Sequence, residues 1–135
     1  MKKGLFFAIC AITVLALDVW GQARRYDQIM KDVSATYEKL KKSLDAKNDA
    51  EAAQDAMKLQ NLFKETEEFW APFDTKDATD AAKGAQTAFA ALSASVNVNN
   101  FQQALTTYNG VTRYCAACHT AHRVQTADQS YRIKP

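Results

Sequence analysis

The segment Cys115-Ala116-Ala117-Cys118-His119 contains the residue types and spacing that most directly indicate chemistry. Two thiols three residues apart share one face of a helix, so both can bond along one edge of a planar ligand. The imidazole that follows the second thiol lies one turn beyond the first, where it can place a ring nitrogen on a metal. This pattern is typical of c-type haem attachment, with two thioether bonds from the Cys residues and His119 as the proximal iron ligand.

Two other chemistries fit the same residues less well, and both stay open. A structural zinc site needs four Cys or His ligands, usually as two pairs, whereas Cys115, Cys118, His119 and His122 are crowded into eight residues. A redox-active thiol pair belongs at a strand-to-helix junction, which a helical sequence lacks. We expect His122 to be a partly exposed polar residue beside the haem edge rather than a ligand.

The N-terminal segment is predicted to be a secretory signal peptide. A basic start, Met1 to Lys3, precedes an apolar run from Gly4 to Leu17, which is short for a bilayer span of ~20 residues. Cleavage after Ala23 is favoured over cleavage after Gly21. A lipid anchor at Cys10 lacks the expected preceding pattern, and an uncleaved membrane anchor is the remaining alternative.

The composition describes one exported domain, residues 24–135, after removal of a signal peptide at residues 1–23. The whole chain has 135 residues, a net charge of +2, 47% hydrophobic residues, four Gly and two Pro. So few turn-forming residues favour helices, and a charge this close to zero argues against nucleic-acid binding. We therefore expect a periplasmic protein with no stable membrane insertion once the signal is cleaved.

Apolar residues recur at alternating intervals of three and four residues in four segments, as expected for helices packed nearly parallel to their neighbours. Asn48 is expected to cap the second helix, and Pro72 is expected to end it. Gly110, inside the fourth helix, marks either a close backbone approach or an unremarkable exposed position. The predicted helices are Tyr26 to Leu44, Asn48 to Pro72, Ala78 to Ser95 and Phe101 to about Val124, followed by a loose polar tail at 124–135.

Four helices with three short connections predict an all-α, antiparallel up-down-up-down bundle around one core. The first predicted helix carries its stripe at Tyr26, Met30, Val33 and Tyr37, and further along at Leu40 and Leu44. The third helix is rich in Ala and is expected to be thin and closely packed. A bundle of this size can hold a cofactor if the helices splay apart.

A four-helix chain with one haem motif near its C-terminus, followed by Arg123 four residues after His119, resembles the cytochrome c-prime family, the class II cytochromes c. The resemblance covers nearly the whole exported chain. Class I cytochromes c have the reverse order, with the haem motif near the N-terminus. The resemblance implies a periplasmic haem protein, often a homodimer, with the haem between helices.

The resemblance also implies a role for Met30. In the family, a first-helix residue at this position lies over the open face of the iron, and it is Met in members that transfer electrons. A Met on an apolar stripe can also be core filler, and Met57 is the other Met of the exported chain. Tyr26 stands where the family often has Arg, which leaves Arg123 as the candidate for a haem propionate.

The expected function is one-electron transfer through a single haem c with His119 and Met30 as axial ligands, in exchange with redox partner proteins. The alternative is a five-coordinate haem protein that binds gases such as nitric oxide or carbon monoxide. An enzyme is not expected, because no His or carboxylate is predicted on the inward side of the first helix near Met30 to act as acid or base.

Overall fold

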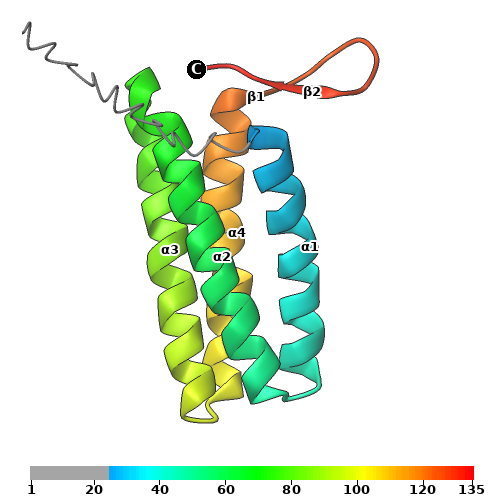
Figure 1. The fold of residues 1–135 in the computed structure, drawn as a ribbon, viewed down its shortest axis with the longest axis vertical. Coiled ribbons are helices and arrows are strands. Elements are labelled where there is room, and N and C mark those ends of the chain that lie inside the picture. Colours follow the sequence, from blue (N-terminus) through cyan, green and yellow to red (C-terminus); the bar gives the residue numbers. More distant parts are fainter. Residues whose placement is uncertain (1–24) are drawn as a thin grey trace, which may run out of the picture.

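The computed structural model describes residues 25–135, so the predicted signal peptide lies outside the described residues. Four long helices follow one another along the chain, and consecutive helices pack side by side (Figure 1). The predicted all-α four-helix bundle with up-down order is confirmed. The elements are α1 (Tyr26–Asp45), α2 (Asp49–Trp70), η1 (Ala71–Phe73), α3 (Lys76–Asn97), α4 (Phe101–His122), β1 (Arg123–Gln125) and β2 (Tyr131–Ile133).

The connections between helices are short and built from capping residues. The predicted cap Asn48 accepts a hydrogen bond through its side chain from the backbone N–H of Glu51 at 3.3 Å, and Asn100 accepts one from the N–H of Gln103 at 3.1 Å. These bonds satisfy donors that a helix N-terminus leaves free. Each connection also turns through one residue with positive φ, and these are Lys47, Asp74 and Asn99.

The third helix is longer than predicted. Sequence analysis ended it at Ser95, because a β-branched residue and several Asn follow, but α3 continues to Asn97. Val96 is 0% exposed. Burial of this side chain in the core outweighs its weak helix propensity.

The closed part of the core lies in the half of the bundle that contains the α1–α2 and α3–α4 turns. Small Ala side chains on the inner face of α3 allow the other helices to approach it closely, as predicted for this thin helix. Large side chains from all four helices fill the space beside the inner face of α3. The largest fully buried ones in this half are Leu40, Leu44, Leu59, Phe89, Leu92, Val96 and Val111.

The close approach that Gly110 could have marked occurs at another glycine. Gly110 is exposed, and a Cβ built there would have no neighbour within 4 Å. At Gly84 on α3, a Cβ would lie 2.2 Å from Cε1 of Tyr114 on α4. The missing side chain at Gly84 therefore leaves the space that the Tyr114 ring occupies between the two helices.

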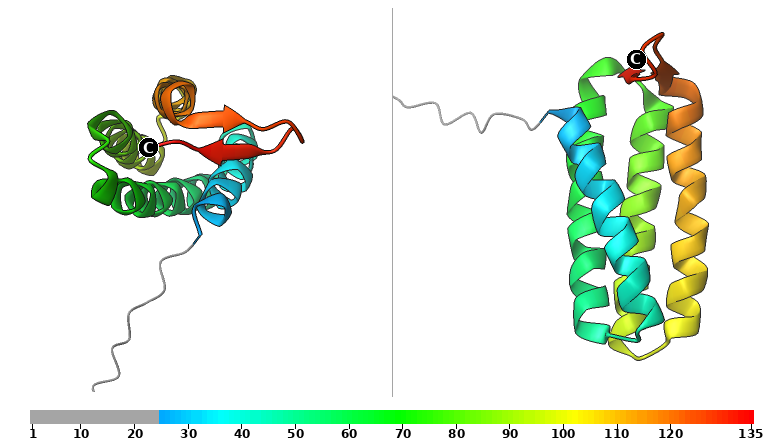
Figure 2. Two further views of the ribbon diagram at one scale, coloured as in Figure 1. Left: turned by 90° about the horizontal axis from the view of Figure 1, so that it is seen from above. Right: turned by 90° about the vertical axis from the view of Figure 1, so that its right-hand side faces the viewer.

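The C-terminal tail is an ordered hairpin, in contrast to the predicted loose segment. Helix α4 ends at His122, and β1 pairs with β2 in antiparallel register. The hairpin crosses the end of the bundle above α1 (Figure 2). Asp128 stabilises its turn by accepting hydrogen bonds from Thr126 and Ser130. Among the described residues, no helix combines the length and apolarity that a bilayer span requires.

Candidate functional site

The bundle is open on one side. Helices α1 and α4 touch at few points, whereas each consecutive pair of helices packs along its length. A cavity of about 970 Å³ lies at the hairpin end, with mostly apolar walls drawn from all four helices. The splayed arrangement that a bound cofactor would require is therefore present in this fold.

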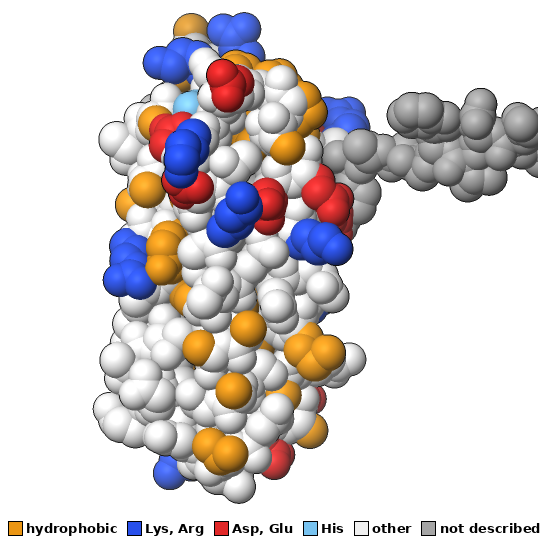
Figure 3. All heavy atoms as spheres, turned by 90° about the vertical axis from the view of Figure 1, so that its left-hand side faces the viewer, with side chains coloured by type: hydrophobic (Ala, Val, Ile, Leu, Met, Phe, Trp, Pro, Cys, Tyr) orange, Lys and Arg blue, Asp and Glu red, His pale blue; other side chains and the backbone are white. Residues whose placement is uncertain are grey.

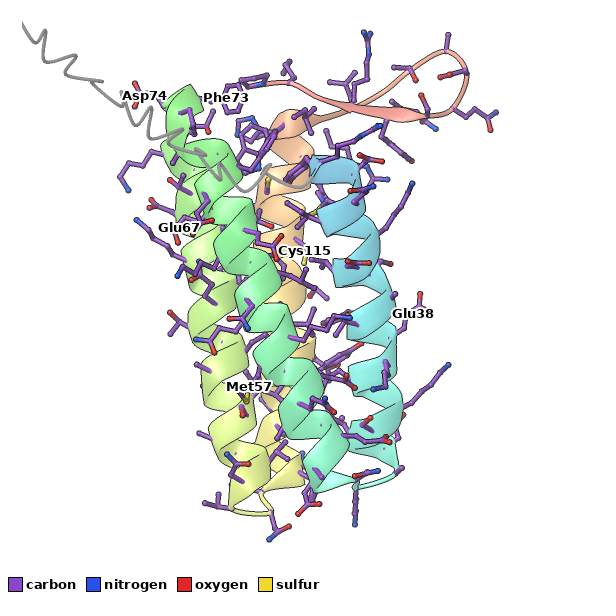
Figure 4. The ribbon with its side chains drawn as sticks, viewed as in Figure 1. Glu38, Met57, Glu67, Phe73, Asp74 and Cys115 are labelled. Atoms are coloured by element: carbon purple, nitrogen blue, oxygen red, sulfur yellow. The ribbon has the colours of Figure 1, made fainter. Side chains whose placement is uncertain are left out.

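The predicted haem-attachment motif faces this cavity. Cys115, Cys118 and His119 lie within the regular part of α4, and all three are partly buried and line the cavity. Figure 4 shows Cys115 on the side of α4 that faces α1. The three-residue spacing brings both thiols and the imidazole to one wall, as the helical argument requires.

Burial sets the protonation of these three side chains. It raises the pKa of the Cys115 thiol and of the Cys118 thiol, since a thiolate is poorly solvated there. Burial also lowers the pKa of His119, and the nearby positive charge of Arg123 lowers it further. At neutral pH the imidazole is therefore uncharged and has one ring nitrogen with a free lone pair.

The two methionines occupy different environments. Met30 is partly buried on α1 and lines the cavity. Met57 lies on α2, where its side chain is 58% exposed and far from the hairpin end (Figure 4). Met30 is thus the single thioether among the described residues that line the cavity.

His122 is not the partly exposed residue that the sequence suggested. It is only 8% exposed, and its ring lies 4.8 Å from that of Trp70. Its Nδ1 contacts the backbone oxygen of Lys134 at 2.8 Å, and its Nε2 contacts the carboxylate of Asp77 at 2.9 Å. Both ring nitrogens therefore have protein partners, and His122 joins α3, α4 and the end of the hairpin.

Arg123 lies where α4 gives way to the hairpin, at the mouth of the cavity. Its guanidinium lies 3.5 Å from the centre of the Tyr131 ring, a cation–π arrangement. Tyr131 and Ile133 also border the cavity. The hairpin therefore forms part of the cavity wall, which the sequence did not indicate.

Tyr26 stands one turn before Met30 and is held in place by α2. Its ring stacks on Phe69 with centroids 4.4 Å apart, and its hydroxyl oxygen accepts a hydrogen bond from Nε1–H of Trp70 at 3.1 Å. Burial raises the pKa of Tyr26 to about 12, so the phenol stays neutral. The Tyr26 side chain therefore brings no charge to the cavity at neutral pH.

Tyr37 and Tyr108 form the main bridge between α1 and α4. The Tyr37 hydroxyl donates to the backbone oxygen of Tyr108 at 2.8 Å, and the Tyr108 hydroxyl donates to that of Tyr37 at 3.2 Å. Their rings stack 4.1 Å apart. Tyr37 lies on the predicted apolar stripe of the first helix, but no local signal reveals that it pairs with Tyr108. Because Tyr37 lines the cavity, this pair forms the floor below which the helices close together.

One carboxylate does border the cavity near Met30, contrary to the sequence expectation. Asp27 lies three residues before Met30, in ion pairs with Arg25 at 3.1 Å and Lys31 at 3.5 Å. Desolvation acts to raise the pKa of Asp27, but these two cations outweigh it and lower the pKa. The carboxyl group is therefore ionised at neutral pH and is poorly suited to donate a proton.

Neither the zinc site nor the redox-active thiol pair, the two alternatives for this motif, has a second supporting feature in residues 25–135. No group of three His, Cys, Asp or Glu side chains in this range is arranged to hold a metal ion. Cys115 and Cys118 are both free thiols, and they lie inside α4 rather than at a strand-to-helix junction. Comparison with protein-family models, curated proteins and solved structures gives no match for this chain.

Proposed function

We propose that this protein is a c-type cytochrome that carries one electron through a single covalently bound haem. The observation that supports the proposal is that Cys115, Cys118, His119 and Met30 line one largely apolar cavity. Its volume of about 970 Å³ is near the upper end of the range of about 300–1,000 Å³ for ligand sites, as a large planar cofactor would require. The residues present therefore fit a haem.

Each of these residues has a distinct task. Cys115 and Cys118 would hold the haem through thioether bonds, His119 would be the proximal iron ligand, and Met30 the second axial ligand. Arg123, at the mouth of the cavity, is the candidate to pair with a propionate. When bound, the haem would supply reversible one-electron oxidation and reduction of its iron.

The protein residues favour a carrier over an enzyme. Met30 and His119 together would occupy both axial positions and leave none for a substrate. Burial keeps His119 neutral and able to ligate without prior loss of a proton. The one carboxylate among the described residues that line the cavity, that of Asp27, is held ionised by two cations, so it is not the proton donor that peroxidatic chemistry needs.

The predicted signal peptide supports a periplasmic location for this activity, where haem c is attached and where soluble carriers exchange electrons with redox partner proteins. The resemblance to class II cytochromes c adds a homodimer as an expected assembly. The net charge of +2 gives no support to nucleic acid as a partner.

The proposal is tested by expression in a periplasm that contains a haem-attachment system. We expect a red protein whose haem remains with the polypeptide in acid acetone and whose mass exceeds that of the processed chain by one haem. Cys115→Ala combined with Cys118→Ala should abolish the covalent attachment. A colourless wild-type protein, or a double variant that still holds haem covalently, would refute the assignment. A protein that is high-spin and rapidly saturated by carbon monoxide would instead favour the gas-binding alternative.

A further inference from the structure

The C-terminal hairpin has two different faces. Residues paired directly across antiparallel strands point to the same side, and the side alternates along each strand. Arg123 pairs with Ile133, and Gln125 with Tyr131. Three of these four residues border the cavity, so this face is turned toward it. The other face, which carries Val124 and Arg132, is exposed as well.

Cations dominate the outward face. Val124 pairs with Arg132 on this side, and Arg132 also reaches the mouth of the cavity. Lys134 continues the alternation two residues later. Val124 is 42% exposed, and Tyr131, although it also lines the cavity, is 54% exposed. We call this surface, formed by Val124, Tyr131, Arg132 and Lys134, the hairpin surface.

Charge is unevenly distributed along the molecule. Residues 123–135 carry three basic side chains and one acidic side chain, a net charge of +2, whereas residues 25–122 carry eleven basic and thirteen acidic side chains, a net charge of −2. The single acidic residue of the hairpin, Asp128, is turned into its own loop by hydrogen bonds from Thr126 and Ser130. Figure 3 shows Lys and Arg side chains at the top of the molecule, where the hairpin lies. The charge asymmetry would orient an approaching acidic protein toward this end.

We propose that the hairpin surface is the docking site for a redox partner protein that presents a patch of carboxylates. The inference rests on the proposed electron-transfer function, because the hairpin covers the cavity end where Cys118 and His119 lie. An exposed aromatic ring and an aliphatic side chain between cations match the composition of protein interfaces. Electron-transfer encounters are also the small, weak class of interface that such a short element can provide.

A protein partner fits this surface better than an anionic membrane. Lipid-binding segments usually gather four to eight Lys or Arg residues, but residues 123–135 contain three, of which Arg123 is engaged with the Tyr131 ring. Carboxylates held at fixed positions on a folded partner can pair individually with Arg132 and Lys134.

The test uses the haem-loaded protein and a gold electrode coated with a carboxylate-terminated monolayer as the acidic surface. Surface plasmon resonance measures adsorption whether or not haem is present, and voltammetry measures the electron-transfer rate. Arg132→Glu with Lys134→Glu should slow adsorption by about tenfold at low salt, within the range of electrostatic steering. The matched control, Lys47→Glu with Lys58→Glu, makes the same change in net charge at exposed sites far from the hairpin and should slow adsorption much less.

Lys134→Glu alone serves as a second variant in case the double change perturbs the cavity, since only the backbone of Lys134 bonds to His122. Lys134→Glu should also slow adsorption relative to the wild type, while the visible spectrum stays that of the wild type. Equal losses in the hairpin and control variants would overturn the docking surface. Stronger binding to phosphatidylglycerol vesicles than to the monolayer, lost in the hairpin variants, would overturn it in favour of a membrane. A wild-type protein that adsorbs as expected but shows no redox wave would instead contradict the electron-transfer function.

Discussion

At the scale of single residues, the two methionines form a matched pair for testing axial ligation. Met30 lines the cavity, and Met57 is 58% exposed on α2. With haem bound, Met30→Ala should turn the oxidised iron high-spin, speed carbon monoxide binding and lower the reduction potential, because thioether ligation favours ferrous iron. Absorption spectra and spectroelectrochemical titration measure these changes.

Met57→Ala should change none of these properties. Truncation of a buried Met costs ~2–5 kcal/mol. Because Met57 is exposed, Met57→Ala should lower the free energy of unfolding by less than this amount. A wild-type protein without the weak far-red absorption of sulfur-to-iron charge transfer, or a Met30→Ala protein with an unchanged spectrum, would show that Met30 is core filler.

The two histidines of the motif region should differ in the kind of damage their loss causes. His119→Ala should remove the proximal ligand and change the visible spectrum. His122→Ala should leave the spectrum near that of the wild type but lower the free energy of unfolding by ~1–3 kcal/mol, since a buried ring that contacts Asp77 and Lys134 is lost. Spectra combined with thermal unfolding separate the two effects. Equal spectral loss in both variants would mean that His122 also ligates the iron.

Local spacing could predict the residues that share a helix face, but not residues whose partners are distant in sequence. Cys115, Cys118 and His119 reach one cavity wall because they lie within five residues of a regular helix. The burial of His122 depends on Asp77, which is 45 residues away in the sequence. No pattern near His122 contains that contact, and its exposure was therefore predicted wrongly.

At the scale of elements, the two glycines inside helices should respond in opposite ways to the same substitution. Gly84→Ala places a methyl group 2.2 Å from the Tyr114 ring, so α3 and α4 must separate or the ring must move, at a cost of ~1–3 kcal/mol. Gly110→Ala meets no neighbour and should stabilise the helix by ~0.5–1 kcal/mol. Denaturant unfolding measures both. A destabilising Gly110→Ala together with a neutral Gly84→Ala would contradict the observed α3–α4 packing.

The helices were predictable because their apolar periodicity extends over many residues, whereas the hairpin strands have three residues each and carry no periodic signal. Only some residues of the apolar stripe on α1 lie in the packed core. Leu40 and Leu44, near the C-terminal end of α1, are buried in the core as expected. Met30 and Tyr37 instead line the cavity, and Ile29, which the stripe did not include, is buried in the core. Periodicity identifies the inner face of a helix but does not show whether protein or a cofactor covers that face.

At the scale of the whole molecule, the bundle divides its tasks between its two ends. The end with the α1–α2 and α3–α4 turns is closed by large buried side chains and by the Tyr37–Tyr108 bridge. The other end is open between α1 and α4, and the hairpin covers it. A packed lower half can hold the helices in register while the upper half keeps a cavity that apolar burial alone would tend to collapse.

The hairpin's contribution is tested by a chain that ends at Val124. Haem should still be attached covalently, because Cys115, Cys118 and His119 all belong to α4. Without Tyr131, Ile133 and the Lys134 backbone, the cavity should admit more water and His122 should lose a partner. Greater exposure to water favours the more highly charged ferric state, so the reduction potential should fall, and the free energy of unfolding should drop by ~1–3 kcal/mol. Spectroelectrochemical titration and thermal unfolding measure these two quantities.

The control is Lys134→Ala, which keeps the backbone contacts and should leave both the reduction potential and the free energy of unfolding near the wild-type values. An unchanged potential in the shortened chain would mean that the hairpin does not shield the cavity from solvent.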